Sequence, residues 1–408
     1  MKTEGADIVV VGGGVAGYAA AMSASENNSV ILVEGSSHPG GATTQTNVGT
    51  LCGLYYRSPS ATLVHHSFCK KFVDDLFQYD EQARLVSMPD ELHVISYEWS
   101  NLQKLLVEKL NSGKVKLLLN TKITQAAFND NIVTSMLTER GTRINGEAFI
   151  DCTGTGNVAQ LVGHSMIRDE SYQSASQVIR LSNVKTQNEY SLNLAMKKAV
   201  VMRTSANSFP RSYSSISVIP GSLTANKVDL KLPLSTVITD RVDQSATLKK
   251  EVEQNITALL ATIREVESLS EAIVDIIFPS PGIRIQQRPK GSSILTEDHV
   301  VNCKNSSDAV AIGTWPIEEW DYDGKVKVEH LQGDSYTIPS GCLMSPSFKN
   351  LFFAGKGISA ETRAIASARV TGTCLQTGYA AGKLATSRND MDMKKIISEI
   401  QREISSRQ

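Results

Sequence analysis

Residues 8–24 read IVVVGGGVAGYAAAMSA, and residues 30–35 read VILVEG. The first four residues are β-branched and apolar, which predicts a short buried strand. The alanine-rich stretch after the glycines predicts a helix, and the second apolar run predicts another buried strand that ends at Glu34. The order strand, GxGxxG, helix, strand, acid is typical of a dinucleotide-binding βαβ unit. The sequence therefore predicts an α/β fold with a Rossmann-like domain around this motif.

Each motif residue has a physical role in such a unit. Gly12 allows the tight turn, Gly14 lets the backbone approach a pyrophosphate, and Gly17 lets the helix pack close to the strand. The free N–H groups and the positive dipole end of the helix bind the phosphates. Glu34, 22 residues after Gly12, is expected to accept hydrogen bonds from a ribose diol.

A second pair of glycines follows the acid. Residues 40–44 read GGATT, so the acid is followed by five residues and then by Gly40 and Gly41. Paired glycines at this distance let the chain pass close to the adenosine-diphosphate half of a dinucleotide and turn down along a flavin. The GxGxxG motif alone does not choose between FAD and NAD, and this second pair favours FAD.

The composition excludes several classes of protein. The 408 residues are 41% hydrophobic and 20% charged, which fits a globular protein of two or three domains. The net charge of -1 and the absence of a Lys/Arg block predict no nucleic-acid partner. No stretch approaches the roughly 18 apolar residues of a membrane span, and no signal peptide is recognisable. Six cysteines without a CxxC pair predict reduced thiols, no metal site and a cytoplasmic location.

With these motifs, the chain resembles the FAD-dependent oxidoreductases related to glutathione reductase and fumarate reductase that have a single dinucleotide-binding domain. The likeness is carried by residues 7–44, residues 120–123 with 149–156, residues 282–318 and residues 336–382. It implies a Rossmann-like FAD-binding domain of three-layer ββα type, with an inserted α+β substrate or cap domain. It also implies FAD as the cofactor.

The segment near residue 350 is the most specific part of the likeness. Leu351 to Ala354 predicts a buried strand, Gly355 its turn, and Ala364 to Thr386 one long helix. The resemblance implies that this helix points its N-terminus at the flavin pyrimidine ring, where its dipole would stabilise the anionic reduced flavin. Together, the motifs and the resemblance assign these residues to the cofactor: Gly12, Gly14, Val15, Ala16, Gly17, Glu34, Gly35, Gly40, Gly41, Ala42, Thr43, Ile123, Thr153, Gly154, Gly355, Lys356, Ala366, Arg369 and Val370.

The predicted domain boundaries follow from these segments. The FAD-binding domain comprises residues 1–50, 96–163 and 282–390, with a small helical insertion at 51–95 and a C-terminal helix at 391–408. The substrate or cap domain comprises residues 164–281. Within it we expect strands at 177–181, 214–218 and 228–232, and helices at 188–203 and 243–266.

Departures from the related families narrow the chemistry. A redox cysteine pair and a second GxGxxG motif are both missing, which argues against a disulfide reductase. Gly355 is followed by Lys356, where aromatic hydroxylases usually have Asp. This difference argues against the hypothesis of a monooxygenase but does not exclude it. Glu318 and its neighbours stand where the family usually has Asp and a nearby His, so the substrate is not carried over from the resemblance.

The leading hypothesis is a dehydrogenase or oxidase that takes a hydride from a C–H bond next to oxygen or nitrogen of a small molecule. Arg284 and Arg288 are candidates for anchoring an anionic substrate group, and Glu318 and Glu361 are candidate bases. Cys52 is interpreted as a small buried hydrophobe rather than a flavin attachment site. Three alternatives stay open: an NAD(P)H-using monooxygenase, a flavoprotein that modifies a side chain of a partner protein, and a flavin-binding scaffold without activity. A homodimer also stays open.

Overall fold

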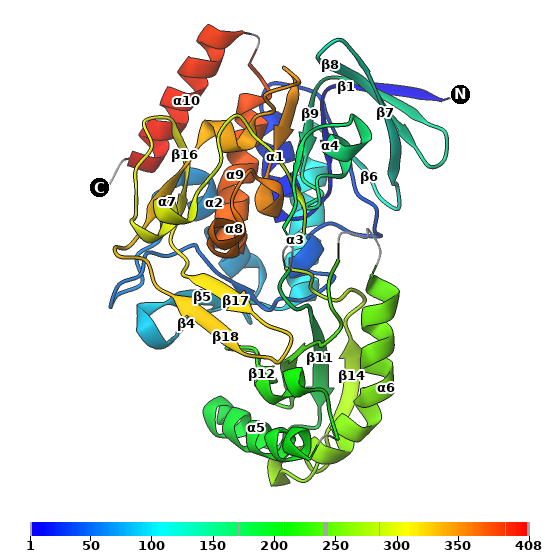
Figure 1. Ribbon diagram of the computed structural model, residues 1–408, viewed down its shortest axis with the longest axis vertical. Helices are drawn as coiled ribbons and strands as arrows, with labels where there is room; N and C mark the ends of the chain where they lie inside the picture. Colours follow the sequence, from blue (N-terminus) through cyan, green and yellow to red (C-terminus); the bar gives the residue numbers. More distant parts are fainter. Residues whose placement is uncertain are drawn as a thin grey trace.

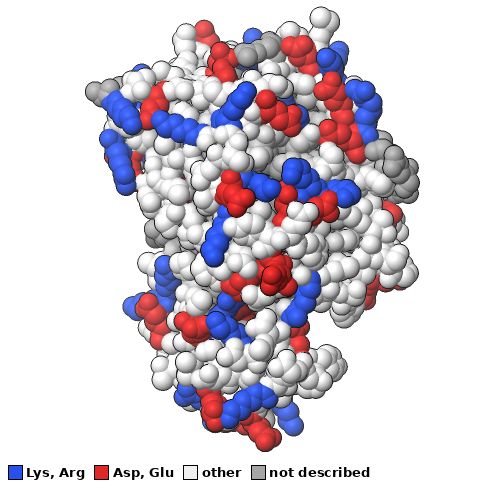
Figure 2. Space-filling view, turned by 180° about the vertical axis from the view of Figure 1, so that it is seen from behind, with Lys and Arg blue, Asp and Glu red and all other residues white. Residues whose placement is uncertain are grey.

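The computed structural model describes residues 2–169, 172–206, 208–239, 244–284, 286–387 and 389–405. One part of the molecule is built on a parallel sheet and includes both ends of the described chain (Figure 1). The other part, at the bottom of that view, holds an antiparallel sheet and the helices α5 and α6. Lys and Arg side chains are interspersed with Asp and Glu on the face in Figure 2, so neither sign of charge dominates there.

Five parallel strands, in the order β6-β2-β1-β9-β20, form the main part of a seven-stranded sheet. The hairpin of β7 (Ile123–Asn129) and β8 (Ile132–Thr138) continues this sheet, because β8 pairs antiparallel with β9. Val11 pairs with Val33 and with Asp151, and Asp151 pairs with Phe353. Four strands therefore reach their carboxyl ends at one edge of the sheet, which is where open α/β sheets bind ligands. The strands are β1 (Thr3–Val11), β2 (Val30–Val33), β6 (Val115–Leu118), β9 (Arg143–Asp151) and β20 (Leu351–Phe353).

The two faces of this sheet are covered differently. Ile8 and Val10 face a core shared with the helices, while Val9 and Val11 face a second core shared with the hairpin β7–β8 and with α4. The result is three layers, which confirms the predicted ββα architecture. The covering elements are α1 (Val15–Ala24), α3 (Trp99–Ser112), α9 (Thr371–Leu384), β7 (Ile123–Asn129), β8 (Ile132–Thr138) and α4 (Asn157–Leu161).

Small residues hold α9 against α1. A Cβ atom on Gly378 would lie 2.2 Å from the backbone oxygen of Ala16, and one on Gly382 would lie 2.4 Å from that of Ala20. The hydroxyl of Ser23 donates a hydrogen bond to the backbone oxygen of Tyr379 at 2.9 Å. Because no larger side chain fits this contact, the position of α9 is tied to the dinucleotide-binding helix.

The predicted long helix at 364–386 is wrong in one respect, because the chain breaks it into two. Helix α8 (Thr362–Ala368) has Arg369 as its C-cap residue. The next residue, Val370, is extended, with φ −72° and ψ 159°. The N–H of Gly372 then donates to the backbone oxygen of Cys52 at 2.8 Å. The helix whose N-terminus lies beside residues 52–54 is therefore α9, which begins at Thr371.

The segment predicted as the cap forms a four-stranded antiparallel sheet in the order β12-β13-β11-β14. Strand β12 is shorter than the predicted strand at 214–218, because residues 211–215 form a 3₁₀ turn. The elements are β11 (Ser176–Ser182), α5 (Glu189–Ser205), β12 (Ser217–Val218), β13 (Lys227–Pro233), α6 (Ser245–Ile263) and β14 (Ile273–Ile277).

The segment at 51–95 is not purely helical as predicted, because it carries strands β4 and β5 beside its helix α2, and these form a three-stranded sheet with β3. In the described ranges, no helix is long and apolar enough to cross a membrane. The predicted C-terminal helix begins at Asp390 and is described to Ser405, so its last three residues lie outside the described chain. The remaining elements are β3 (Thr50–Leu51), α2 (Ser67–Tyr79), β4 (Arg84–Ser87), β5 (His93–Ser96), β10 (Met166–Ile167), β15 (Arg288–Pro289), α7 (Glu297–Val301), β16 (Ala309–Gly313), β17 (Ile317–Trp320), β18 (Val326–Glu329), β19 (Tyr336–Pro339) and α10 (Asp390–Ser405).

Candidate functional site

The turn between β1 and α1 requires its glycines. Gly12 has φ +100°, and a Cβ atom there would lie 2.5 Å from the backbone oxygen of Cys152. A Cβ atom on Gly17 would lie only 1.8 Å from the backbone oxygen of Gly12. By contrast, a Cβ atom on Gly14 would have no described atom within 4 Å. Gly12 and Gly17 are thus needed for close packing of the backbone. Gly14 instead faces open space at the start of the helix, as a pyrophosphate site requires.

The carboxylate of Glu34 lies beside this turn at the end of β2. Its Oε2 accepts a hydrogen bond from the N–H of Gly13 at 2.6 Å. Its Oε1 accepts bonds from the N–H and the hydroxyl of Ser36, at 2.8 and 2.7 Å. These bonds fix the carboxylate next to the glycine turn, where an acid can bind a ribose diol.

The second glycine pair lies directly against the first motif. Gly40 has φ +113°, and its N–H donates to the backbone oxygen of Gly13 at 2.7 Å. A Cβ atom on Gly41 would lie 3.1 Å from the Cα atom of Gly14. The hydroxyl of Tyr97 donates to the backbone oxygen of Thr43 at 2.8 Å, and Ala42 stays exposed. Segments 12–17 and 40–43 therefore form one continuous surface.

Two further glycine turns extend this surface along the sheet edge. Gly154 has φ +73°, and a Cβ atom on it would lie 2.4 Å from the Cε atom of Lys356. Gly355 has φ +67°, and a Cβ atom there would lie 2.8 Å from that of Ala16. The ammonium of Lys356 donates to the backbone oxygen of Ile283 at 3.0 Å, and burial lowers its pKa to about 8. We call residues 12–17, 34–43, 153–156, 355–357 and 371–384 the cofactor frame.

Other residues assigned to the cofactor lie within this frame or beside it. Thr153 donates its hydroxyl to Asp151 at 2.6 Å, and Gly35 lies beside Lys122. Ile123 and Ala366 are buried in the two hydrophobic cores. The structure thus gives these two side chains a packing role.

Unpaired buried polar atoms lie where the frame reaches the N-terminus of α9. In the described part of the chain, the Nε of Arg369 and the hydroxyl of Thr373 have no hydrogen-bond partner. Buried polar groups are almost always paired, so such atoms fit a ligand with several acceptors. Together with the glycine surface and the acid, they make the residues present a good fit for a dinucleotide with a polar ring system at this end.

A group of charged residues adjoins the frame at this point. Arg369 donates from its Nη2 to Gln173 and to the backbone oxygen of Glu318, both at 3.2 Å. The thiol of Cys374, on α9, donates to the backbone oxygen of Arg369 at 3.2 Å. A Cβ atom on Gly355 would lie 3.7 Å from the same sulfur. This chain of contacts joins the frame to strand β17.

The carboxylate of Glu318 is held by two tryptophans. The indole N–H of Trp315 donates to Oε1 at 3.0 Å, and that of Trp320 donates to Oε2 at 3.4 Å. The carboxylate keeps further lone pairs after accepting these two bonds. Glu318 is half-buried, so it is positioned by the protein and still accessible.

Cations from three parts of the chain surround this carboxylate. The ammonium of Lys231 lies 4.2 Å from the centroid of the Trp320 ring, and the guanidinium carbon of Arg284 lies 4.4 Å from it. Burial, together with nearby cations, lowers the pKa of Lys231 to about 8 and that of Arg284 to about 9. We call Cys52, Lys231, Arg284, Glu318 and Arg369 the charged cluster.

Cys52 belongs to the cluster because its pKa responds to Glu318, Lys231 and Arg369. Burial raises the pKa of its thiol to about 12, so the thiol stays protonated at neutral pH. Its sulfur lies 3.6 Å from the hydroxyl of Thr50. This environment agrees with the interpretation of Cys52 as an unreactive, mostly apolar side chain.

Two residues considered from the sequence lie apart from the cluster. Arg288, expected to anchor a substrate anion, is fully buried and pairs with Asp169 at 2.7 Å. Glu361 is exposed and precedes α8, and its carboxylate accepts the N–H of Glu297 at 2.7 Å. The structure thus provides a local packing partner for each of these charges.

Sequence reasoning missed Lys231, Trp315 and Trp320. The only available signal for Lys231 was the alternation along β13, which places it on the same face as Asp229. That pattern is also what any half-buried strand shows, so it did not single out the lysine.

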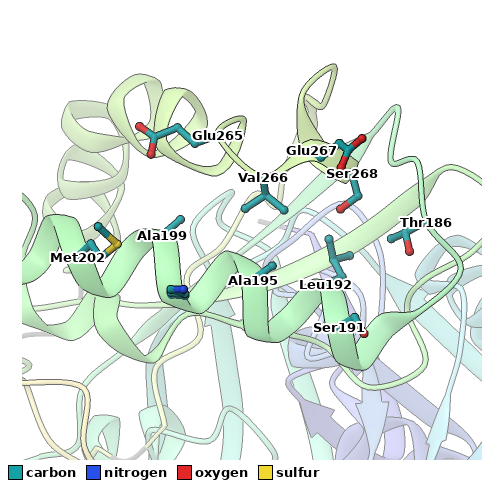
Figure 3. A pocket seen from close by; sticks show the side chains of 11 residues that line it. Thr186, Ser191, Leu192, Ala195, Ala199, Met202, Glu265, Val266, Glu267 and Ser268 are labelled. Atoms are coloured by element: carbon teal, nitrogen blue, oxygen red, sulfur yellow. The ribbon is translucent and has the colours of Figure 1, made fainter.

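A hollow of about 530 Å³ opens elsewhere, on the cap. Figure 3 shows it between helix α5, with Leu192, Ala195 and Ala199, and the segment that carries Glu265 and Val266. It is lined by none of the frame or cluster residues, and its side chains offer no convergent catalytic groups. We therefore do not consider this hollow a candidate active site.

Comparisons with known proteins agree with the frame. A family model described as FAD dependent oxidoreductase matches residues 7–404. No curated protein matches the sequence. Among solved structures, a geranylgeranyl bacteriochlorophyll reductase-like protein from Thermoplasma acidophilum is 12% identical, with a TM-score of 0.50 over 98% of this chain and 84% of that one. The p-nitrophenol 4-monooxygenase of Pseudomonas putida is 11% identical, with a TM-score of 0.48 over 98% and 81%. At these identities, the likeness to the first supports the fold alone.

Proposed function

The chain belongs to the FAD dependent oxidoreductase family, and from that premise we propose that it takes a hydride from a C–H bond next to oxygen or nitrogen of a small organic substrate. FAD, when bound, supplies the hydride acceptor. The enzyme would be a dehydrogenase or an oxidase according to how the electrons leave. The residues of the cofactor frame would hold FAD, with its pyrophosphate at the start of α1 and a ribose at Glu34.

The observation that carries this proposal is the setting of Glu318. Oxidation at such a C–H bond also releases a proton from the neighbouring O–H or N–H group, and a positioned carboxylate can accept it. Glu318 is fixed by two indole N–H groups, and its backbone oxygen accepts a hydrogen bond from Arg369, two residues before the start of α9. Arg284 lies in the same cluster and would anchor an anionic group of the substrate.

The first experiment is anaerobic reduction of the FAD-loaded protein. A panel of small alcohols, amines and their carboxylate-bearing analogues is added, and bleaching of the flavin absorbance is followed. The proposal expects bleaching by at least one panel member and none by NADPH or NADH. Rapid bleaching by NADPH would instead favour the monooxygenase alternative, and a panel without any effect would favour a substrate on a partner protein.

With a reducing substrate in hand, Glu318→Gln tests the base. We expect the rate of flavin reduction to fall by roughly 10²- to 10⁴-fold, because the amide cannot accept a proton. FAD content should stay that of the wild type. The matched variant Glu361→Gln removes an exposed carboxylate outside the cluster and should leave the rate unchanged. Wild-type reduction of the Glu318→Gln protein would rule out this carboxylate as the base.

A further inference from the structure

The cap contributes one lysine to the charged cluster. Along β13, Val228, Leu230 and Leu232 are fully buried in the cap core. Asp229 and Lys231 lie on the opposite face of the strand, because side chains alternate. Asp229 is already bonded to Arg180 and Asn47. Lys231 is the next side chain along this face.

The ammonium of Lys231 has no hydrogen bond or ion pair to any described residue, and its identified neighbour is the ring of Trp320, 4.2 Å away. The guanidinium carbon of Arg284 lies 4.4 Å from the centroid of the same ring, and one N–H of this guanidinium donates to the backbone oxygen of Ser174. Both side chains are half-buried rather than extended into water. Two cations thus meet at one aromatic ring, and each has donors to spare.

The charges of the cluster do not balance. Lys231, Arg284 and Arg369 contribute three positive charges and Glu318 one negative charge, which leaves a net +2. Partly buried charges of one sign are unfavourable unless an anion joins them. Burial lowers the pKa of Lys231, and Arg284 lowers it further, as expected of a cation site without its anion. Arg369 adjoins the cofactor frame, so we assign its positive charge to the cofactor. About one positive charge of the cluster then remains for another ligand.

We infer that Lys231 and Arg284 together bind one carboxylate group of the substrate, with Lys231 contributed by the cap. The inference rests on the proposed function, whose substrate it narrows to a small alcohol or amine that carries a single carboxylate. Lys231 acts as a binding residue here, and Glu318 keeps the role of base. The cap thereby selects the substrate by charge, while the frame holds the cofactor.

Ligand binding without turnover tests this inference. Benzoate and benzamide have nearly the same size, and only benzoate is charged at neutral pH. Each is titrated into the FAD-loaded protein, and binding is measured by calorimetry and by the change in the flavin spectrum. We expect benzoate to bind at pH 7 and Lys231→Met to weaken it by roughly 10- to 100-fold, the usual value of a hydrogen bond to a charged group. Benzamide affinity should be the same in both proteins.

Two matched variants make the result specific. Lys231→Arg keeps the charge and should restore most of the benzoate affinity. Lys227→Met removes an exposed lysine from the start of the same strand and should change nothing. Correct folding of Lys231→Met is established by its FAD content, which the inference expects to be normal.

The pH dependence gives an independent reading. The pKa of Lys231 lies at about 8 among Arg284, Glu318, Cys52 and Arg369, whereas benzoate stays ionised throughout. Benzoate affinity of the wild type should therefore fall between pH 7 and pH 9 as Lys231 loses its proton. Lys231→Arg should bind with little change over this range, because arginine keeps its charge.

The inference would be overturned by equal benzoate affinity in wild type and Lys231→Met, or by a wild type that binds no benzoate at all. Both results are independent of catalysis. If the panel of substrates fails but benzoate binds through Lys231, the proposed reaction is wrong and the anion site stands. If a neutral alcohol reduces the flavin and benzoate affinity ignores Lys231, the reaction stands and the anion site is wrong.

Discussion

The cofactor frame and the cap differ in the kind of chemical group that would contact a ligand. In the frame, the groups that would touch a ligand are backbone N–H groups, and glycines such as Gly12 and Gly17 are needed because no Cβ atom fits. In the cap, the groups of interest are side chains, and they are held by other side chains. Asp229, for example, is bonded by Arg180 at 2.6 Å and by Asn47 at 2.8 Å. A backbone site tolerates little change of sequence, whereas a side-chain site can be altered to suit another substrate.

The same network joins the two regions. Arg180 lies on β11 and also pairs with Glu98 at 3.0 Å, next to the start of α3. Asn47 belongs to the segment that follows the double glycine. The cap sheet is thus fixed to the cofactor-binding part by buried polar bonds, which demand defined geometry. This arrangement lets Lys231, two residues beyond Asp229, reach the charged cluster.

The largest effect on FAD binding should come from closing the space at the start of α1. Gly14→Val fills a position where a Cβ atom meets no described atom, so the protein should fold. The added side chain would occupy the expected pyrophosphate site, and FAD affinity should fall by at least about tenfold, or about 1.4 kcal/mol. The ratio of flavin to protein after purification measures this.

Glu34→Ala should also yield mostly apo protein, because it removes the acid that is expected to bind the ribose. Gly5→Ala in β1, the strand that precedes the glycine turn, is the control, since its Cβ atom would make an ordinary contact at 3.7 Å with Asn145. Full flavin content in both Gly14→Val and Glu34→Ala would contradict the assignment of the frame.

The largest effect on stability should come from the network between the two regions. Asp229→Ala leaves the buried guanidinium of Arg180 with Glu98 alone, and such losses cost about 3–5 kcal/mol of the free energy of unfolding. Glu265→Ala breaks the exposed pair with Arg203 instead and should cost less than about 1 kcal/mol. Chemical denaturation of both variants gives the comparison. Equal losses would mean that the network is not what holds the cap.

A smaller effect on stability should come from His66, which lies in the cofactor-binding part. Burial lowers the pKa of this histidine to about 4, and its ring meets that of Tyr379 edge-on at 4.9 Å. The unfolded chain binds the proton more readily, so stability is retained above about pH 6.5 and is lost as the pH falls towards 4. The loss amounts to about 3 kcal/mol. The free energy of unfolding of His66→Leu should fall less over this range, and identical pH profiles would contradict the explanation.

Particular residues show how far sequence reasoning reached. The roles of Gly12 and Gly17 were predicted because the GxGxxG pattern has one structural solution. The break at Val370 was not, since residues 364–386 contain no proline and the break depends on the backbone of Cys52. Of the candidate bases, Glu318 and Glu361 looked alike in the sequence, and only the two indoles distinguish their surroundings.

The sequence by itself determined the α/β fold, the dinucleotide-binding turn and the choice of FAD, because local backbone geometry demands glycines at fixed spacings. Only the tertiary structure decided the composition of the charged cluster. Its members come from positions 52, 231, 284, 318 and 369, which no local pattern connects. They meet because β13 of the cap lies close to β17, and β17 lies close to the start of α9. Such contacts depend on how distant surfaces fit together, and a charged residue on a strand looks the same in sequence whether it faces water or a substrate.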